Sequence, residues 1–406
     1  MNKLYSHKEK LLYTHLSNVS KKMLDKFDNK SLDLKVFKNE NLRKLVYLVG
    51  ICHDFGKSME FFQDKLKGKN NHLSDHALIS AFFCMFLVDE LKMENKSLYK
   101  YISFLIIRRH HGAINAPKKI EIRQAIDLDK QLKNILKNNK REIIDIYSRL
   151  LEEDIDLEKI FKNMENSFRK KVKKINRETL RFLKELADED IIEVFLVINY
   201  IFSLLVSCDK KDAARIDEEV FSDKIKILDV KKYIDNKFSL EKKIDLKRNE
   251  FLNNILNSKI NKDNFLYTIT APTGIGKTLS SFALVNKIKE EFKVNKMIYC
   301  LPYTSIIDQN YNVFEDVFLN NTKDDEISYE YLIKHHYLTF FDSKDKEGKL
   351  RNENLDYLDN KLLLESWESQ NIVTTFVQFL ESIITNSNSR LKKFENMINS
   401  IILLDE

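Results

Sequence analysis

Residues 265–278 read FLYTITAPTGIGKT, a short apolar run followed directly by a loop that ends in Gly-Lys-Thr. A strand that leads into such a loop, with a helix after it, is the context in which backbone amides cradle nucleotide phosphates. We expect Lys277 to reach the β and γ phosphates and Thr278 to hold Mg²⁺, and we expect the loop residues Thr273, Gly274 and Gly276 to form the cradle. The stretch therefore predicts an ATP and Mg²⁺ site within an α/β domain.

Three more apolar runs follow this loop and alternate with helical stretches: KMIYCL at 296–301, NIVTTFV at 371–377 and IILL at 401–404. Together with 265–270 they predict a parallel α/β sheet. Residues up to about Ala214 carry helical signals almost throughout, and Leu42, Leu45, Val46 and Val49 are spaced to line one helix face. We therefore predict a multidomain chain, with an all-α domain over residues 1–220, a linker over 221–245 and an α/β domain over 246–406.

Composition is that of a soluble globular protein, since 43% of the 406 residues are hydrophobic and 32% are charged. The net charge of +6 permits a nucleic-acid partner without requiring one. The four cysteines are scattered through apolar runs, and the N-terminus lacks the apolar core of a signal peptide, so a reducing cytoplasm fits best. Residues 118–189 are highly charged and predict solvated helices. The apolar run 191–208 contains Glu193 and Asn199, and we expect a buried core helix rather than a membrane span.

Histidines and aspartates recur at intervals along the helical part of the chain. They are His15 in THLSNVS, His53 and Asp54 in CHDFGK, His76 in DHALIS, His110 and His111 in RRHHG, and Asp209 in VSCDKKDAA. Imidazole and carboxylate together suit Fe, Mn, Co or Ni. A lone His-Asp pair is more often a helix cap or a core histidine, but the full series predicts an HD-type metallohydrolase site.

The set is large enough for two divalent ions bridged by Asp54, because a single ion would leave ligands over. Two ions about 3.5 to 4 Å apart would activate a water molecule and clamp a phosphodiester for in-line attack. Lys57 follows His53 by four residues, so we expect it on the same helix face, where its ammonium could stabilise developing charge on the phosphate. His7, His72, His335 and His336 stay outside the predicted site.

Beyond the phosphate loop the chain reads LPYTSIIDQ at 301–309, TTFVQFL at 374–380 and IILLDE at 401–406. This order is that of the first DNA-tracking motifs and the acidic magnesium motif of superfamily 2 helicases. Asp405 would be the magnesium ligand and Glu406 the base that activates water. With the histidine series ahead of these motifs, the chain resembles the CRISPR-associated nuclease-helicases of type I interference systems.

The resemblance implies an HD-type nuclease domain and an incomplete RecA-like helicase lobe, which together degrade single-stranded DNA and move 3′ to 5′ with ATP. It also implies recruitment by an RNA-guided surveillance complex, and no membrane. His15, His53, Asp54 and Asp209 map onto one metal, and Asp54, His76, His110 and His111 onto the other. Two departures stand out: Lys247 to Leu252 offers Arg248 but no glutamine for adenine recognition, and nothing follows the acidic motif, as expected of a C-terminally truncated chain.

Two other interpretations stay open. HD-type sites also hydrolyse nucleotides and small phosphoesters, in which case the α/β part would be an ATP-binding regulatory domain. Alternatively, the chain could be an ATP-regulated scaffold with an inactive metal site. A comparison of activity on single-stranded DNA with activity on free nucleotides separates the phosphohydrolase from a nuclease. Measurement of the metal content tests the scaffold interpretation.

Overall fold

The computed structural model describes residues 3–115, 121–153, 155–215, 227–239, 241–322, 327–335 and 365–405, without the side chains of 166–176. Its chain divides into two compact units. The first unit comprises Met1–Ile216 and Thr385–Glu395, and the second comprises Asp217–Ile384 and Asn396–Glu406. Each unit is described here by itself.

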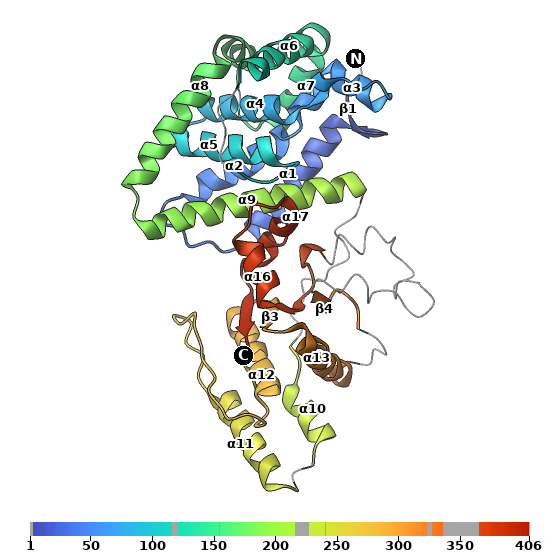
Figure 1. Ribbon diagram of the computed structural model, residues 1–406, viewed down its shortest axis with the longest axis vertical. Helices are drawn as coiled ribbons and strands as arrows, with labels where there is room; N and C mark the ends of the chain where they lie inside the picture. Colours follow the sequence, from blue (N-terminus) through green and yellow to red (C-terminus); the bar gives the residue numbers. More distant parts are fainter. Residues whose placement is uncertain are drawn as a thin grey trace. The chain divides into compact units, whose positions relative to one another are not determined.

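The first unit is a set of packed helices (Figure 1). Its α-helices are α1 (Leu12–Asp28), α2 (Asn39–Cys52), α3 (Glu60–Leu66), α4 (Ala77–Glu90), α5 (Lys96–Arg109), α6 (Ile122–Asn138), α7 (Lys140–Leu150), α8 (Leu157–Glu185), α9 (Asp188–Ala214) and α17 (Asn388–Leu391). Two 3-10 helices, η1 (Phe55–Ser58) and η2 (His72–Ser74), connect some of them.

Helices α1, α2, α4, α5 and α9 pack against one another and form the core of the first unit (Figure 1). The predicted face of α2 is buried as expected, including Leu42, Leu45, Val46 and Val49. Helix α4 is buried nearly all round, because its residues from Ile79 to Val88 are almost all apolar. The charged stretch after α5 forms α6, α7 and α8, as the sequence predicts.

Helix α9 contains the long apolar run. Among the described residues it is the one helix long and apolar enough to cross a membrane, but 67% of that apolar window is buried inside the protein. Asn199 within the run is buried, and Asp209 and Asp212 follow near the helix end. Burial of this kind is what a core helix of a globular unit requires.

Two features of the first unit were not expected. A small antiparallel hairpin, β1 (Tyr5–His7) and β2 (Lys10–Leu11), precedes α1, so the unit is not purely helical. Residues 385–395 belong to this unit, although they lie within the predicted α/β domain. Leu391 and Phe394 of this segment are buried, and α17 lies beside α9 (Figure 1).

The second unit contains a four-stranded parallel sheet of order β4-β5-β3-β6. The strands are β3 (Met297–Leu301), β4 (Leu332–His335), β5 (Asn371–Thr375) and β6 (Ile401–Leu404). The helices are α10 (Val230–Lys237), α11 (Lys243–Asn257), α12 (Lys277–Phe292), the 3-10 turn η4 (Thr304–Ile306), α13 (Ile307–Asn321) and α16 (Phe376–Ile383), while η5 (Phe394–Asn396) spans the division between the units. Phe282 of α12 and Phe314 of α13 pack with Tyr299 and Val373 of the sheet. The parallel sheet is confirmed.

The second unit differs from the sequence-based expectations in three details. Residues 265–270 form no strand, and Phe265 and Leu266 are 88% and 84% exposed, because strand-forming residues need a pairing partner and none of the described strands pairs with them. Strand β4 was not predicted, since its sequence LIKH is short and half polar. Residues 228–237, expected in the linker, instead pack into the core of the second unit through Val230 and Tyr233.

Candidate metal centre and nucleotide site

Asp54 lies in a tight turn between α2 and η1, and it is completely buried. Gly56 of this turn packs directly on the start of α4: a Cβ atom there would lie 2.7 Å from the His76 carbonyl oxygen. Its amide donates a hydrogen bond to Ser80 Oγ at 2.9 Å. Because Gly56 has no side chain, the turn can approach α4 closely, and this approach places Asp54 opposite His76.

Lys57 lies in the same turn, and the prediction that it shares a helix with His53 is wrong. Helix α2 ends at Cys52, and the backbone then tightens into the 3-10 turn η1. Lys57 is only 4% exposed, and its Nζ lies 2.6 Å from Asp54 Oδ2. The ammonium therefore faces the Asp54 carboxylate directly, rather than along a helix face.

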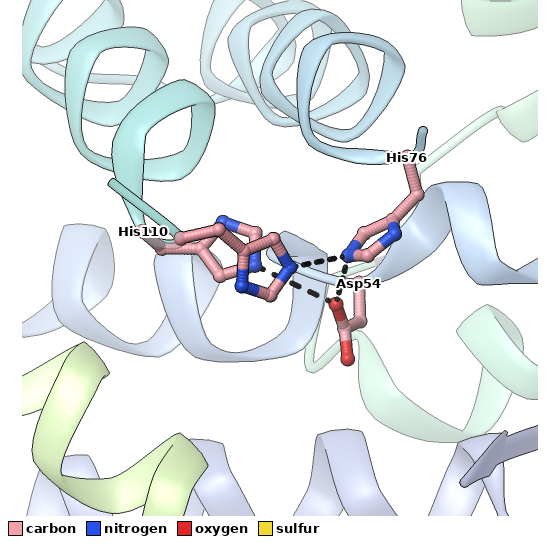
Figure 2. A group of neighbouring side chains, drawn as sticks. Asp54, His76 and His110 are labelled. Carbon is pink, nitrogen blue, oxygen red and sulfur yellow. Dashed lines mark hydrogen bonds and ion pairs between the residues drawn. The ribbon is translucent and has the colours of Figure 1, made fainter. Parts of the chain in front are cut away.

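The other predicted ligands come from the ends of several helices that converge on Asp54. His53 follows α2, His76 precedes α4, His110 and His111 follow α5, His15 lies in α1, and Asp209 lies near the end of α9. Figure 2 shows the rings of His76 and His110 directed at the Asp54 carboxylate. The structure thus brings all seven predicted residues together, in two groups that share Asp54.

The first ligand group consists of His15, His53, Asp54 and Asp209, whose ligand atoms all lie within 4.8 Å of one another. His15 Nε2 is 3.1 Å from Asp54 Oδ2 and 3.3 Å from Asp209 Oδ1. His53 Nε2 is 3.4 and 3.5 Å from the same two oxygens. Two imidazole nitrogens and two carboxylate oxygens therefore surround one small volume.

The second ligand group consists of Asp54, His76, His110 and His111, within the same 4.8 Å limit. His76 Nε2 is 2.9 Å from Asp54 Oδ1, and His110 Nε2 is 3.7 Å from that oxygen (Figure 2). His111 Nε2 lies 2.9 Å from His76 Nε2. Asp54 therefore directs Oδ2 into the first group and Oδ1 into the second.

The outer nitrogen of three of these rings is engaged in a hydrogen bond. His53 Nδ1 lies 2.8 Å from the Gly50 carbonyl, and His110 Nδ1 lies 2.6 Å from the Ile107 carbonyl. A carbonyl can only accept, so Nδ1 of both rings carries a proton, and Nε2 is the ring nitrogen left to bind a metal. This arrangement is typical of metal-binding histidines.

Asp212 does the same for His15, and it is a residue that the sequence analysis missed. Its Oδ2 lies 2.5 Å from His15 Nδ1 and 2.6 Å from Lys10 Nζ, and its Oδ1 accepts a hydrogen bond from Asn18 Nδ2 at 3.0 Å. Asp212 follows Asp209 by three residues in α9, so both carboxylates lie on one helix face. That spacing was the available signal.

Charges in the site are strongly coupled. Burial alone would raise the pKa of Asp54, but Lys57 and the neighbouring histidines hold it well below its usual range. Burial lowers the pKa of His15, yet the negative charges of Asp209, Asp212 and Asp54 close to its ring outweigh burial and raise it to about 10. The pKa of His53 rises to about 9 in the same way, whereas burial and two nearby histidines lower that of His111 to about 3. The carboxylates of the first group are thus stabilised by a positive charge beside them, which either protonated histidines or a bound metal can supply.

The residues present fit a pair of divalent transition metals. Both Asp54 oxygens and His110 Nε2 are buried and have no hydrogen-bond partner; Lys57 approaches Oδ2 closely but outside hydrogen-bonding geometry. Buried polar atoms are rarely left in this condition unless an ion or another group engages them. Imidazole and carboxylate donors are those that Mn, Fe, Co and Ni accept.

His7, His72 and His335 lie outside both groups, as predicted. His7 packs edge-on against His15 with ring centroids 5.0 Å apart, and burial lowers its pKa to about 4. His72 is mostly exposed. His335 is buried in the second unit and its Nδ1 accepts a hydrogen bond from Trp367 Nε1 at 3.1 Å, whereas His336 lies outside the described residues.

The phosphate loop of the second unit has the backbone that the motif requires. Gly274 and Gly276 have φ angles of +78° and +92°, a region of backbone conformation that residues with a side chain rarely adopt. Lys277 begins α12 directly after the loop, so the loop leads into a helix N-terminus, where backbone N–H groups favour a bound anion. Arg248 Nε donates a hydrogen bond to the Gly274 carbonyl at 2.9 Å and so braces the loop from α11.

Tyr299 connects the phosphate loop with the acidic motif, and the sequence analysis missed it. Tyr299 is the middle residue of the buried strand β3, and its hydroxyl donates a hydrogen bond to Asp405 Oδ2. Thr278 lies near enough to this hydroxyl to influence its pKa. Burial and Asp405 raise the pKa of Tyr299 far above its usual value. The two predicted magnesium-binding residues, Thr278 and Asp405, therefore both lie near the Tyr299 hydroxyl, whereas Glu406 lies outside the described residues.

The chain is similar in sequence to several known proteins. The family model described as type III restriction enzyme, res subunit, matches residues 241–406. A CRISPR-associated nuclease/helicase Cas3 of Haloferax volcanii is 28% identical over 148 residues, which are 34% of this chain and 15% of that protein. A putative Cas3 of Methanocaldococcus jannaschii is 25% identical over 265 residues, which are 62% of this chain and 35% of that protein.

Solved structures of T. fusca Cas3 share the fold. The complex with AMPPNP covers 98% of this chain at a TM-score of 0.57 and 12% identity, and the complex with ATP covers the same share at 0.55 and 13%. This chain spans 45% of the length of those structures and at most about a third of the curated relatives. The chain is therefore similar to Cas3 nuclease/helicases in sequence and in fold, and its second unit matches a helicase-like family.

Proposed function

We propose that the first unit is an HD-type nuclease domain that binds two divalent transition metals and hydrolyses single-stranded DNA. The observation that carries this proposal is the position of the buried Asp54 carboxylate, whose two oxygens face two different ligand groups. A shared carboxylate with imidazoles on either side is the donor arrangement of a two-metal hydrolase. The similarity to Cas3 nuclease/helicases adds DNA as the substrate.

The protein side of the chemistry follows from the contacts. Bound metal ions would supply an activated water molecule and charge stabilisation for the phosphodiester. Asp54 and Asp209 provide the negative charge that offsets them, and the Nδ1 hydrogen bond of His53 fixes the orientation of its ring. Lys57, buried beside Asp54, provides a positive charge at the edge of the site where the phosphate gains negative charge. No covalent nucleophile is required.

For the second unit we propose an ATP-dependent DNA helicase region of the superfamily 2 type that moves 3′ to 5′. The family match over residues 241–406 and the junction of Thr278, Tyr299 and Asp405 support nucleotide and Mg²⁺ binding. By its similarity to Cas3, we further propose that the chain acts in type I CRISPR interference with an RNA-guided surveillance complex.

The test compares the parent with Asp54→Asn on a labelled single-stranded oligonucleotide in Mn²⁺, Co²⁺ and Ni²⁺ buffers. We expect the parent to cleave and Asp54→Asn to lose activity by at least a hundredfold, because both metals lose their shared ligand. Asp64→Asn is the matched control, since Asp64 lies on α3, belongs to neither ligand group and forms an ion pair with Lys69 at 3.6 Å. Equal cleavage by Asp54→Asn and the parent would show that the site assignment is wrong, and hydrolysis of free nucleotides but not DNA would indicate a phosphohydrolase instead.

A further inference from the structure

The first unit has a cavity of about 470 Å³ at the open side of the two ligand groups. One wall consists of the ligands His110, His111 and Asp209 with the loop that follows His111. The other wall consists of Lys210 and residues 386–389, whose sequence is Asn-Ser-Asn-Ser. The segment 385–395 thus reaches the metal site although more than 170 residues separate it from Asp209 in sequence.

This segment is anchored at both ends within the first unit. At one end the Ile114 amide donates a hydrogen bond to the Asn386 carbonyl at 2.8 Å. At the other end the buried Glu395 forms an ion pair with Lys26 at 2.9 Å, and its amide donates to Ser203 Oγ at 2.9 Å. Such anchoring makes residues 386–389 a fixed wall of the cavity.

Asn388 connects the two walls. Its Nδ2 donates to the carbonyl oxygen of the ligand His110 at 2.6 Å, and its Oδ1 accepts a hydrogen bond from Lys210 Nζ at 2.9 Å. The amide therefore holds the Lys210 ammonium at the cavity, directly beside Asp209 in sequence. Ser387 and Ser389, whose hydroxyls are 3.0 Å apart, add neutral donors to the same wall.

The chemistry of this wall suits a phosphodiester. The lining offers one ammonium, two amides and two hydroxyls, and its only carboxylate is that of Asp209, which belongs to the first ligand group. An ammonium together with amide and hydroxyl donors can bind the oxygens of a phosphate through charge and hydrogen bonds. The cavity also opens onto the ligands of both groups, so a strand bound there would continue into the site of hydrolysis.

We propose that Lys210 and residues 386–389 bind a phosphate of the DNA strand next to the one that is hydrolysed. Lys210 is the substrate-binding residue, and Asn388 is a positioning residue that acts through Lys210. This inference rests on the proposed nuclease function and extends it to a specific subsite. The subsite belongs to the first unit, yet its wall is encoded between two motifs of the second.

The experiment uses the whole 406-residue chain with Mn²⁺ and a single-stranded oligonucleotide. Lys210→Gln should raise KM about tenfold and leave kcat within twofold, because a hydrogen bond from a charged group to the substrate is lost. The slope of log binding constant against log salt should fall by about 0.7, the share of one phosphate contact on a single strand. Lys210→Arg should retain most of both, since it keeps the charge.

Asn388→Ala should raise KM less than Lys210→Gln, and the double variant should be no worse than Lys210→Gln alone, because the amide acts through the ammonium. Metal content should equal that of the parent in every variant. Lys133→Gln, an exposed lysine on α6, is the matched control and should behave as the parent.

The outcomes separate the two proposals. If the parent cleaves DNA and Lys210→Gln keeps the KM and salt slope of the parent, the subsite is wrong and the nuclease function stands. If Lys210→Gln or Asn388→Ala loses metal, these residues support the ligands rather than the strand, which also overturns the subsite. If the parent neither cleaves nor binds the oligonucleotide, the proposed function fails and the subsite fails with it.

Discussion

Asp212 offers the sharpest test of the metal centre, because it touches no predicted metal yet orients one ligand. Its carboxylate is only 3% exposed and contacts His15 Nδ1 at 2.5 Å. Burial opposes its ionisation, but hydrogen bonds from His15, Lys10 and Asn18 lower its pKa to about 2, so it is charged at neutral pH. Asp212→Asn keeps the shape of the side chain and removes the charge.

The loss of this partner should weaken the first ligand group by about 10- to 100-fold in metal affinity, the range found when a carboxylate behind a metal-binding histidine is removed. This range corresponds to about 1.4 to 2.7 kcal/mol. The second ligand group contains no contact with Asp212, so its affinity should change far less. We therefore expect one of two metals to be lost selectively.

Calorimetric titration of the metal-free protein with Mn²⁺, followed by elemental analysis after dialysis, measures this directly. Asn18→Ala is the control: it removes one hydrogen bond to Asp212 and leaves the charge, so its effect should be several-fold smaller. Asp212→Asn also removes the ion pair with Lys10, so a thermal melt checks that the variant stays folded. If both metals weaken equally, or if neither does, the assignment of Asp212 to the first group is refuted.

Three further changes probe other parts of the chain. Lys57→Met should lower turnover at least tenfold while metal content stays near that of the parent, since Lys57 faces Asp54 but is no ligand; parallel loss of both would indicate a structural role. Gly276→Ala should abolish binding of a fluorescent ATP analogue, because a φ of +92° strains any side chain there, and unchanged affinity would contradict the cradle. Lys289, which burial holds at a pKa of about 7, takes up its proton only in the unfolded state between pH 7 and 10.5, so stability should rise with pH over that window by at most roughly 5 kcal/mol. Lys289→Met should remove this rise, which urea unfolding followed by fluorescence of Trp367, the single tryptophan, can detect; an identical pH profile would refute it.

Much of the secondary structure could be predicted from the sequence, because it depends on the spacing of apolar residues that are close together in the chain. The spacing of Leu42, Leu45, Val46 and Val49 predicts the buried face of α2, and the structure confirms it. The apolar runs at 296–301 and 401–404 predict β3 and β6, which form within one residue of those limits. The seven predicted ligands lie together in the structure, while their role as metal ligands stays a prediction.

What the sequence by itself determined was therefore the list of chemical groups and the elements that hold them. Their division into two groups was expected only from the family resemblance. The orientation of the Asp54 carboxylate, with one oxygen toward each group, depends on the close approach of Gly56 to α4, which no sequence periodicity encodes. Asp212 reaches His15 across 197 residues, and Asn388 reaches His110 across 278. Contacts of such range arise from packing of whole helices, since the energy that selects them lies in buried surfaces and paired polar atoms far apart in the chain. For the same reason residues 265–270 have strand-forming character but no ladder, and residues 385–395 lie in the first unit although their neighbours in sequence belong to the second.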